Sequence, residues 1–318
     1  MRNVSPTPRS PETSICPSTM NSRLYRLFLR PSLLLASCLL ASAAENAEVQ
    51  PQAALRDALT FHAAFDGTAD ANFARGDRRV YTAADRTKRD EAAPGLPADG
   101  LARIAKNEGR FGDALEFRQK IKPQVFFRGG DNLGYKPTHW SGSVSFWLRL
   151  DPEKLEPGYC DPFQIYAQAW GEGNLFVEFS KDHTPRHFRF GIMAVTKFWN
   201  PQNRKYEEMP EAERPIVPVH RSPFREDRWT HVLVTFANIN SGAADGRGAL
   251  YFDGVKQGAF TGWNNTFNWD VSKSALTLGL NYTGFIDDFA IFDRELSDAE
   301  VRAIYALPQG IGALHRSR

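Results

Sequence analysis

Short segments in which apolar and polar residues alternate recur along most of the chain. The clearest is 143–150, where Val144, Phe146, Leu148 and Leu150 share one face. Successive side chains of a strand point to opposite faces, so this alternation predicts half-buried β-strands. Similar patterns predict further strands at 59–65, 79–82, 114–117, 121–127, 163–170, 174–179, 187–195, 229–236, 249–256, 274–280 and 284–292.

Helical signals are few, whereas turn signals are regular. Asp253-Gly254 predicts a tight hairpin turn. Ser297 and Glu300 form a capping box, which predicts a helix that begins there and ends before Pro308. About a dozen short strands without alternating helices indicate an all-β fold, a two-sheet antiparallel β-sandwich with a short C-terminal helix.

One long segment interrupts the strand pattern. Residues 197–227 are rich in charges and contain five prolines, at positions 201, 210, 215, 218 and 223. Proline lacks a backbone N–H, so a segment this rich in it cannot lie within a central sheet. A loop of this length in a compact domain is usually functional or disordered.

The N-terminal region carries a targeting pattern. Arginines at 23, 26 and 30 precede an apolar run over 32–41, and Ala41-Ser-Ala43 supplies a small-residue cleavage pattern. The run is too short for a permanent membrane-spanning helix. We expect a secretory signal over 1–44, with Met20 as a second candidate start, and a secreted, periplasmic or cell-surface protein without a transmembrane helix.

The remaining boundaries follow from the strand pattern. We expect a linker over 45–56, one domain over 57–310 that contains the 197–227 insertion, and a tail over 311–318. Leu35-Ala-Ser-Cys38 also matches a lipoprotein box, and lipidation at Cys38 would anchor the protein. The apolar Leu39-Leu40 that follows is unlike a polar tether, so release is the preferred interpretation.

Charge and cysteine content exclude some classes of protein. Residues 1–44 hold five of the 39 basic residues and one of the 37 acidic residues, so the rest of the chain has a net charge of −2. That balance predicts no nucleic-acid partner. Cys160 is the one cysteine after residue 44, so no internal disulfide is expected, and we interpret it as a small buried side chain.

Six stretches in order resemble the laminin G-like jelly-roll branch of the concanavalin A-like lectin/glucanase superfamily. The stretches are FHAAFDG (61–67), GRFGDALEF (109–117), SVSFWLRL (143–150), RWTHVLVTF (228–236), LYFDGV (250–255) and the segment 276–305. The resemblance covers about 57–310. It implies two packed, curved sheets with a concave face and loops along its rim.

Glycoside hydrolysis needs two carboxylates about 5–10 Å apart, and the sequence offers no obvious pair. Asp287 and Asp288 are adjacent, so on a regular strand they point to opposite faces. Glu116 and Glu178 are single acids, which we interpret as solvated residues on outer faces. No Gly-x-Ser-x-Gly motif occurs, and no His/Cys spacing predicts zinc. We therefore predict a protein that is not an enzyme.

Calcium is a candidate structural cofactor. It prefers six to eight oxygen ligands, and Asp66 and Asp287 are suitable donors. The resemblance implies that the first and last strands are neighbours, and related sandwiches often carry a calcium ion that bridges them. The alternative is that Asp66 caps a turn and Asp287 accepts hydrogen bonds from backbone amides.

Aromatic residues outside the strand centres suggest a sugar site. Aromatic faces stack on sugar rings, and amides fix their hydroxyls. The densest mixture of both is 263–270. The candidate ligand-binding residues are Trp170, Trp199, Trp263, Asn265 and Trp269. The alternative for each tryptophan is that it pins a long loop to the sandwich.

These observations predict a non-catalytic, lectin-like binding module for a glycan or an extracellular protein, with calcium as a candidate aid. A divergent polysaccharide hydrolase of the same superfamily is the first alternative, and it requires a pair of acids on the concave face. A structural cell-envelope protein without a small ligand is the second, and it requires an aromatic-poor concave face.

Overall fold

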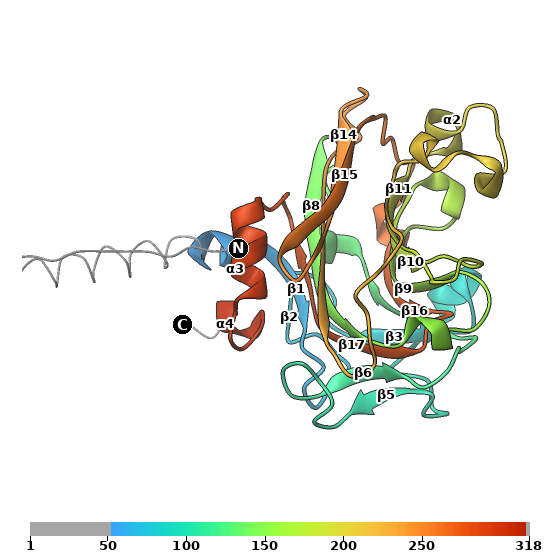
Figure 1. The fold of residues 1–318 in the computed structure, drawn as a ribbon. Helices are drawn as coiled ribbons and strands as arrows, with labels where there is room; N and C mark the ends of the chain where they lie inside the picture. Colours follow the sequence, from blue (N-terminus) through green and yellow to red (C-terminus); the bar gives the residue numbers. More distant parts are fainter. Residues whose placement is uncertain (1–51, 316–318) are drawn as a thin grey trace, which may run out of the picture. The chain divides into compact units, whose positions relative to one another are not determined.

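The computed structural model describes residues 52–315. Two antiparallel β-sheets pack face to face over this range, so the predicted β-sandwich is confirmed (Figure 1). The predicted secretory signal, Cys38 and most of the predicted linker lie outside the described residues. No helix within 52–315 is long and apolar enough to cross a membrane.

The first sheet has nine strands. Seven of them form a continuous row: β15 (Val255–Trp263), β14 (Gly246–Phe252), β13 (Thr230–Ile239), β8 (Trp140–Arg149), β17 (Gly284–Phe292), β1 (Leu59–Ala63) and β2 (Phe73–Ala74). The other two continue from β17: β6 (Ala114–Phe117) and β5 (Ala102–Ala105). The last long strand thus lies beside the first, as the resemblance implies.

The second sheet has eight strands. In order they are β12 (Ile216–Val219), β11 (Phe188–Met193), β10 (Asn174–Phe179), β9 (Cys160–Tyr166), β16 (Ala275–Leu280), β7 (Gln124–Arg128), β3 (Val80–Ala83) and β4 (Ala93–Pro94). Sequence patterns predicted neither β12 nor β4, because proline interrupts both. Both are edge strands, where a missing N–H breaks no ladder.

Phenylalanine side chains fill the space between the sheets. Phe146 of the nine-stranded sheet lies 6.0 Å, ring to ring, from Phe163 of the eight-stranded sheet, and Phe289 lies 5.0 Å from the same ring. All three are buried. Rings at these separations add packing energy beyond the area they bury, which suits a phenylalanine-rich core.

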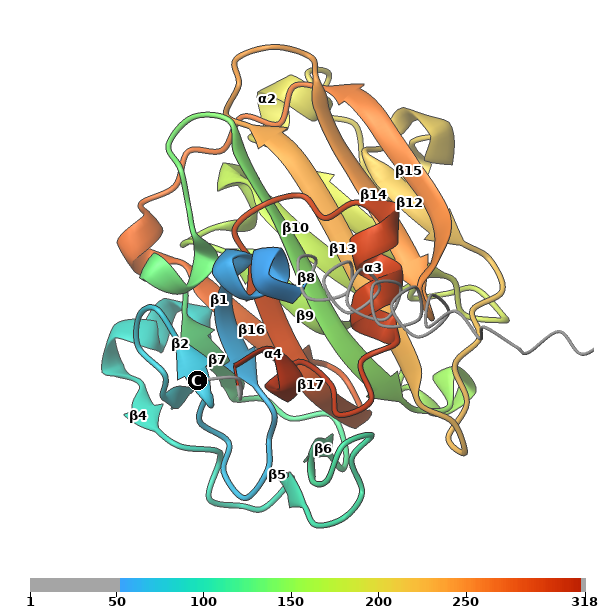
Figure 2. The same ribbon diagram turned by 90° about the vertical axis from the view of Figure 1, so that its left-hand side faces the viewer.

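Helices cover the outer face of the nine-stranded sheet (Figures 1 and 2). These are α3 (Asp298–Tyr305), α4 (Gly312–His315) and a helical segment at 52–58. Ser297 and Glu300 cap α3 as predicted. Leu55 and Leu314 are buried in this layer, so the described parts of the predicted linker and tail pack against the sheet.

The acid pair of β17 differs from its prediction. Asp288 has a φ of 51°, and the pairing with β8 shifts register between Asp287 and Ala290. This bulge turns both carboxylates to the helix-covered side, where both are buried. Asp288 accepts from Ile311 N at 2.9 Å and lies 2.7 Å from His62 Nε2. The expectation of one inward and one outward acid assumed a regular strand and was wrong.

Short helices and turns occupy the loops. The insertion contains α2 (Thr196–Trp199) and two 3-10 helices, η5 (Tyr206–Glu208) and η6 (Glu211–Glu213), before it pairs as β12. Trp199 and Met209 are buried, so this segment is folded against the sandwich. The remaining 3-10 helices are η1 (Arg86–Glu91), η2 (Gly130–Leu133), η3 (Pro152–Lys154), η4 (Trp170–Glu172) and η7 (Val271–Lys273).

Candidate functional site

The outer face of the eight-stranded sheet is polar although it is largely buried. Strand alternation sends Phe163 and Ile165 to the core, and sends Gln164 and Tyr166 to the outer face. Gln164 lies opposite Thr277 of β16. We call this surface the polar face, and it comprises Gln124, Asp161, Gln164, Tyr166, Asn174, Glu178, Arg189 and Thr277, each at most 7% exposed.

Several atoms of the polar face have no hydrogen-bond partner within the described protein. These atoms are Gln124 Oε1, Asp161 Oδ1, Asn174 Oδ1 and Nδ2, Arg189 Nε and Thr277 Oγ1. A buried polar group without a partner costs about 1–3 kcal/mol. Natural proteins keep few such groups, and a cluster of them on one face indicates a surface shaped for more than stability.

A pocket of about 450 Å³ opens over part of the polar face. Its floor contains Gln124, Asp161, Gln164 and Tyr166. Its walls carry aromatic, charged and amide side chains: Tyr159, Trp170, Asp85, Arg86, Lys122 and Asn281. The volume lies in the range of small-molecule sites, and an aromatic wall over convergent polar groups is their usual composition.

Asp161 is the buried acid of this pocket. Burial, and then the charge of Glu178, raise the pKa of Asp161 well above its usual range. Gln164 Nε2 donates to Asp161 Oδ2, and Oδ1 is the oxygen without a partner. A protonated carboxyl both donates and accepts hydrogen bonds, so Asp161 can bind a ligand hydroxyl in either direction.

Glu178 of β10 and Arg189 of β11 form a buried ion pair beside the pocket strands. Arg189 Nη2 lies 2.6 Å from Glu178 Oε1, and the two residues are register partners on β10 and β11. Burial raises the pKa of Glu178 to about 7, and Arg189 opposes the rise. The sequence-based interpretation of Glu178 as a solvated residue was wrong.

The insertion covers this end of the polar face. Tyr206 of η5 lies 5.7 Å from the Arg189 guanidinium, and Tyr159 lies 5.3 Å from it on another side. Burial raises the pKa of each tyrosine to about 12. The Pro-rich insertion therefore seals one part of the outer face and leaves the pocket beside it.

The structure does not gather the five predicted ligand-binding residues. Trp170 is 38% exposed, lines the pocket and lies 6.1 Å, ring to ring, from Phe176. Trp199 is buried against Tyr206 of the insertion. Trp263 is half-buried at the end of β15. Of these three, only Trp170 lines the pocket over the polar face.

The other two predicted residues lie in the loop after β15. Trp269 Nε1 donates to Gly173 O at 2.8 Å, and its ring lies 5.6 Å from that of Trp140. These contacts pin the loop to the sandwich. Asn265 is 2% exposed, and its amide oxygen and nitrogen have no partner within the described protein.

The two predicted calcium ligands meet at one turn. Asp66 Oδ1 accepts from Asp113 N at 2.9 Å, and Asp287 Oδ2 accepts from Phe111 N at 3.0 Å. Gly112 is required between them, because a Cβ there would lie 2.2 Å from Asp66 Oδ1. Burial, and then Asp288, raise the pKa of Asp287 to about 8, and the backbone donors oppose this rise. Backbone amides thus occupy these oxygens, and calcium stays a prediction.

Two nucleophile candidates lie away from any substrate path. Ser145 Oγ lies 2.8 Å from His231 Nε2, but both residues are at most 1% exposed beneath α3. Burial lowers the pKa of His231 to about 4, so the imidazole is neutral. Burial raises the pKa of Cys160 to about 11, which keeps this thiol unreactive.

Comparison with known structures gives distant similarities. One similar structure is domain 4 of AbnA, a GH43 extracellular arabinanase from Geobacillus stearothermophilus, in complex with arabinotriose. It is 16% identical to this chain, with a TM-score of 0.48, and the match covers 78% of this chain and 98% of that domain. The binding domain of Paraclostridial Mosquitocidal Protein 1 is 14% identical, with a TM-score of 0.46, and the match covers 79% of this chain and 52% of that structure. The Botulinum neurotoxin serotype D binding domain is 13% identical with a TM-score of 0.44, covering 80% and 52%.

These TM-scores are too low to carry an argument about function, and the chain spans about half the length of the two toxin structures. No curated protein sequence matches the chain. A family model does match, over residues 134–302, which is more than half of the chain. By that match, the chain belongs to the concanavalin A-like lectin/glucanases superfamily.

Proposed function

We propose that this protein is a lectin-like module that binds a glycan in the pocket over the polar face. The observation that carries the proposal is the pocket floor, where Gln124 Oε1 and Asp161 Oδ1 are buried without partners beside an exposed tryptophan. Sugar hydroxyls both donate and accept hydrogen bonds, so one class of ligand satisfies these atoms.

The pocket walls suit the apolar faces of a sugar ring. Trp170 is exposed at the rim, and Tyr159 lies on the wall. An aromatic ring stacked on a sugar ring buries apolar C–H groups while the hydroxyls at the ring edge reach polar side chains. The concave shape favours a glycan over a protein surface as the partner, because protein interfaces are larger and flatter.

A glycan array with the full chain tests the proposal, followed by titration calorimetry with the best ligand. We expect Trp170→Ala to weaken binding about tenfold, or about 1.4 kcal/mol, because it removes the stacking surface. Trp263→Ala is the matched control, since Trp263 lies outside the pocket. Equal affinity of both variants and the unaltered chain would contradict the assignment of this pocket.

Hydrolysis is a second candidate function, and one observation favours it. Asp161 and Glu178 leave the adjacent strands β9 and β10 on the same face, and both have raised pKa values. A general acid near neutral pH needs such a shift. Release of reducing ends from oligosaccharides, abolished in Asp161→Asn and Glu178→Gln, would support hydrolysis; binding without release would support the lectin.

Two accompanying proposals concern regions away from the pocket. We propose that Asp66 and Asp287 hold a structural calcium ion, supported by their attachment to one turn. We also propose that the chain is exported, supported by the targeting pattern in 1–44. Neither proposal is needed for glycan binding, so each is tested separately.

A further inference from the structure

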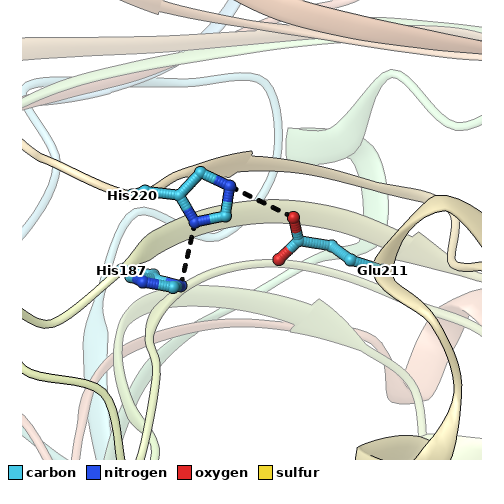
Figure 3. Close-up of side chains that lie close together, drawn as sticks. All are labelled: His187, Glu211 and His220. Atoms are coloured by element: carbon cyan, nitrogen blue, oxygen red, sulfur yellow. Dashed lines mark hydrogen bonds and ion pairs between the residues drawn. The ribbon is translucent and has the colours of Figure 1, made fainter.

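Three side chains converge at the surface where the insertion meets the eight-stranded sheet (Figure 3). They are His187, Glu211 and His220, and one ligand atom from each lies within 4.8 Å of the other two. Among residues 52–315, no other group of three or more His, Cys, Asp or Glu side chains has such spacing. It lies outside the residues that line the pocket over the polar face.

The sheet itself positions the two histidines. Phe188 of β11 pairs with Val219 of β12. One step further along this antiparallel register, His187 faces His220, and directly opposed side chains lie close together. The backbone N–H of His187 donates to Ser180 Oγ at 3.0 Å, which fixes the start of β11. The two Nδ1 atoms lie 3.2 Å apart.

Glu211 supplies an anionic group from the insertion. It begins η6, and its Oε1 lies 3.3 Å from His220 Nε2. The side chains of His220 and Glu211 are 59% and 36% exposed, so both rotate with little obstruction and an ion can reach them from solvent. The ring of His183 stacks on that of His187 at 3.8 Å, which holds His187 from the other side.

The separation between the two histidines fits a small tetrahedral ion. Zinc binds His nitrogen and carboxylate oxygen at about 2.0–2.2 Å, which places neighbouring ligand atoms of a tetrahedron roughly 3.4 Å apart. The separation of 3.2 Å between the Nδ1 atoms is close to that value. Imidazole nitrogen with one carboxylate selects zinc, copper, nickel or cobalt, whereas calcium and magnesium prefer sites made of oxygen alone.

We propose that His187, His220 and Glu211 form a binding site for a divalent transition-metal ion of the zinc type. The three residues supply two nitrogen ligands and one oxygen ligand and leave a fourth position open to solvent. Each ligand comes from a different structural segment: the β10–β11 connection, η6 and the residue after β12. The ion therefore ties the insertion to the sheet at the end of the polar face that Tyr206 covers.

Titration calorimetry of the full chain with Zn²⁺ alone tests the site. We expect one Zn²⁺ ion per chain, a rise in Tm on adding Zn²⁺ that a chelator reverses, and the same Zn²⁺ affinity when an equal concentration of Ca²⁺ is present. Co²⁺ bound in its place gives the intense visible absorption of a tetrahedral N/O site. Displacement of bound Zn²⁺ by an equal concentration of Ca²⁺ would overturn the assigned class of ion.

Single replacements test the ligands. His220→Ala and His187→Ala are expected to weaken binding at least a hundredfold, and Glu211→Gln about tenfold. The matched control is His139→Asn, because His139 is an exposed histidine outside the cluster and asparagine tolerates its positive φ of 52°. Unchanged binding in both histidine variants, or equal loss in the control, would overturn the site.

Proteolysis tests the tie between the insertion and the sheet. Zn²⁺ is expected to slow cleavage within 197–227 about tenfold in the unaltered chain and to leave the rate unchanged in His220→Ala. The His220 side chain is exposed, so the His220→Ala variant is expected to keep the native fold. Equal protection of both chains by Zn²⁺ would place the effective ion elsewhere and overturn the proposal.

Discussion

The two outer faces of the sandwich differ in how much of their buried surface is apolar. On the nine-stranded sheet, Leu233 and Phe292 face out and are sealed under Val301 and Ile304 of α3. On the eight-stranded sheet, the corresponding layer is the polar face, with buried atoms that lack partners and a pocket above it. One face therefore stabilises the fold, whereas the other retains polar groups that folding alone does not require.

The largest expected effect comes from the helix-covered face. Leu233→Ala removes a fully buried side chain, and we expect the free energy of unfolding to fall by about 2–5 kcal/mol. Urea denaturation measures this loss. Glycan affinity below the unfolding transition is expected to be unchanged. A loss of affinity in the folded variant would show that the two faces are coupled.

The next effect concerns pH. The folded pKa of Asp287, about 8, lies above its usual 3.8, so the folded state holds more protons between these values. The contribution of Asp287 to the free energy of unfolding is therefore most favourable below about pH 4, and it falls as the pH rises toward 8. The slope approaches about 1.4 kcal/mol per pH unit for one proton.

Denaturation at several pH values from 5 to 8 measures this slope, and Asp287→Asn is expected to flatten it. The raised pKa of Glu178, about 7, acts in the same direction and stays in the variant. An identical slope in both chains would show that Asp287 is ionised throughout, held by the N–H groups of Phe111 and Asp288.

A smaller effect is expected from calcium. If Asp66 and Asp287 hold the ion, millimolar calcium should stabilise the fold by about 1 kcal/mol when it exceeds the Kd several-fold. Thermal melts with calcium and with a chelator measure the shift. Asp66→Asn keeps an oxygen for Asp113 N but loses the charge, and exposed Asp99→Asn is the control. A shift that survives Asp66→Asn would remove Asp66 from the site.

The smallest effect belongs to the polar face. Thr277→Val replaces a buried hydroxyl without a partner by a methyl group of similar shape. We expect the free energy of unfolding to change by less than about 0.5 kcal/mol, or to rise, because no hydrogen bond is lost. A loss as large as that of Leu233→Ala would mean that the polar face stabilises the fold as strongly as the covered face does.

Local patterns predicted most of the fold. Alternation located the long strands other than β15, most of which lies beyond the strand predicted over 249–256, and the Ser297–Glu300 capping box located α3. The strands β12 and β4 were not predicted, because proline usually interrupts a strand, although an edge strand tolerates it. The bulge at Asp288 was not predicted either, because the alternating pattern assumes a regular strand. A positive φ at an aspartate does not change that pattern.

The candidate site was harder to predict because its residues come from distant segments. Gln124, Gln164 and Thr277 share a face only because β7, β9 and β16 are neighbours in the sheet. His187 and His220 are 33 residues apart and meet only through the pairing of β11 with β12. Polar residues at 161 and 164, within an otherwise apolar strand, were the one local signal available.

The two prolines at the margins of the eight-stranded sheet have a consequence for assembly. Pro218 lies in β12 and Pro94 in β4, so each free margin lacks an amide that an incoming strand would require. Open sheet margins invite a neighbouring chain to add its own strand, which leads to aggregation. This sheet therefore resists self-association at both ends.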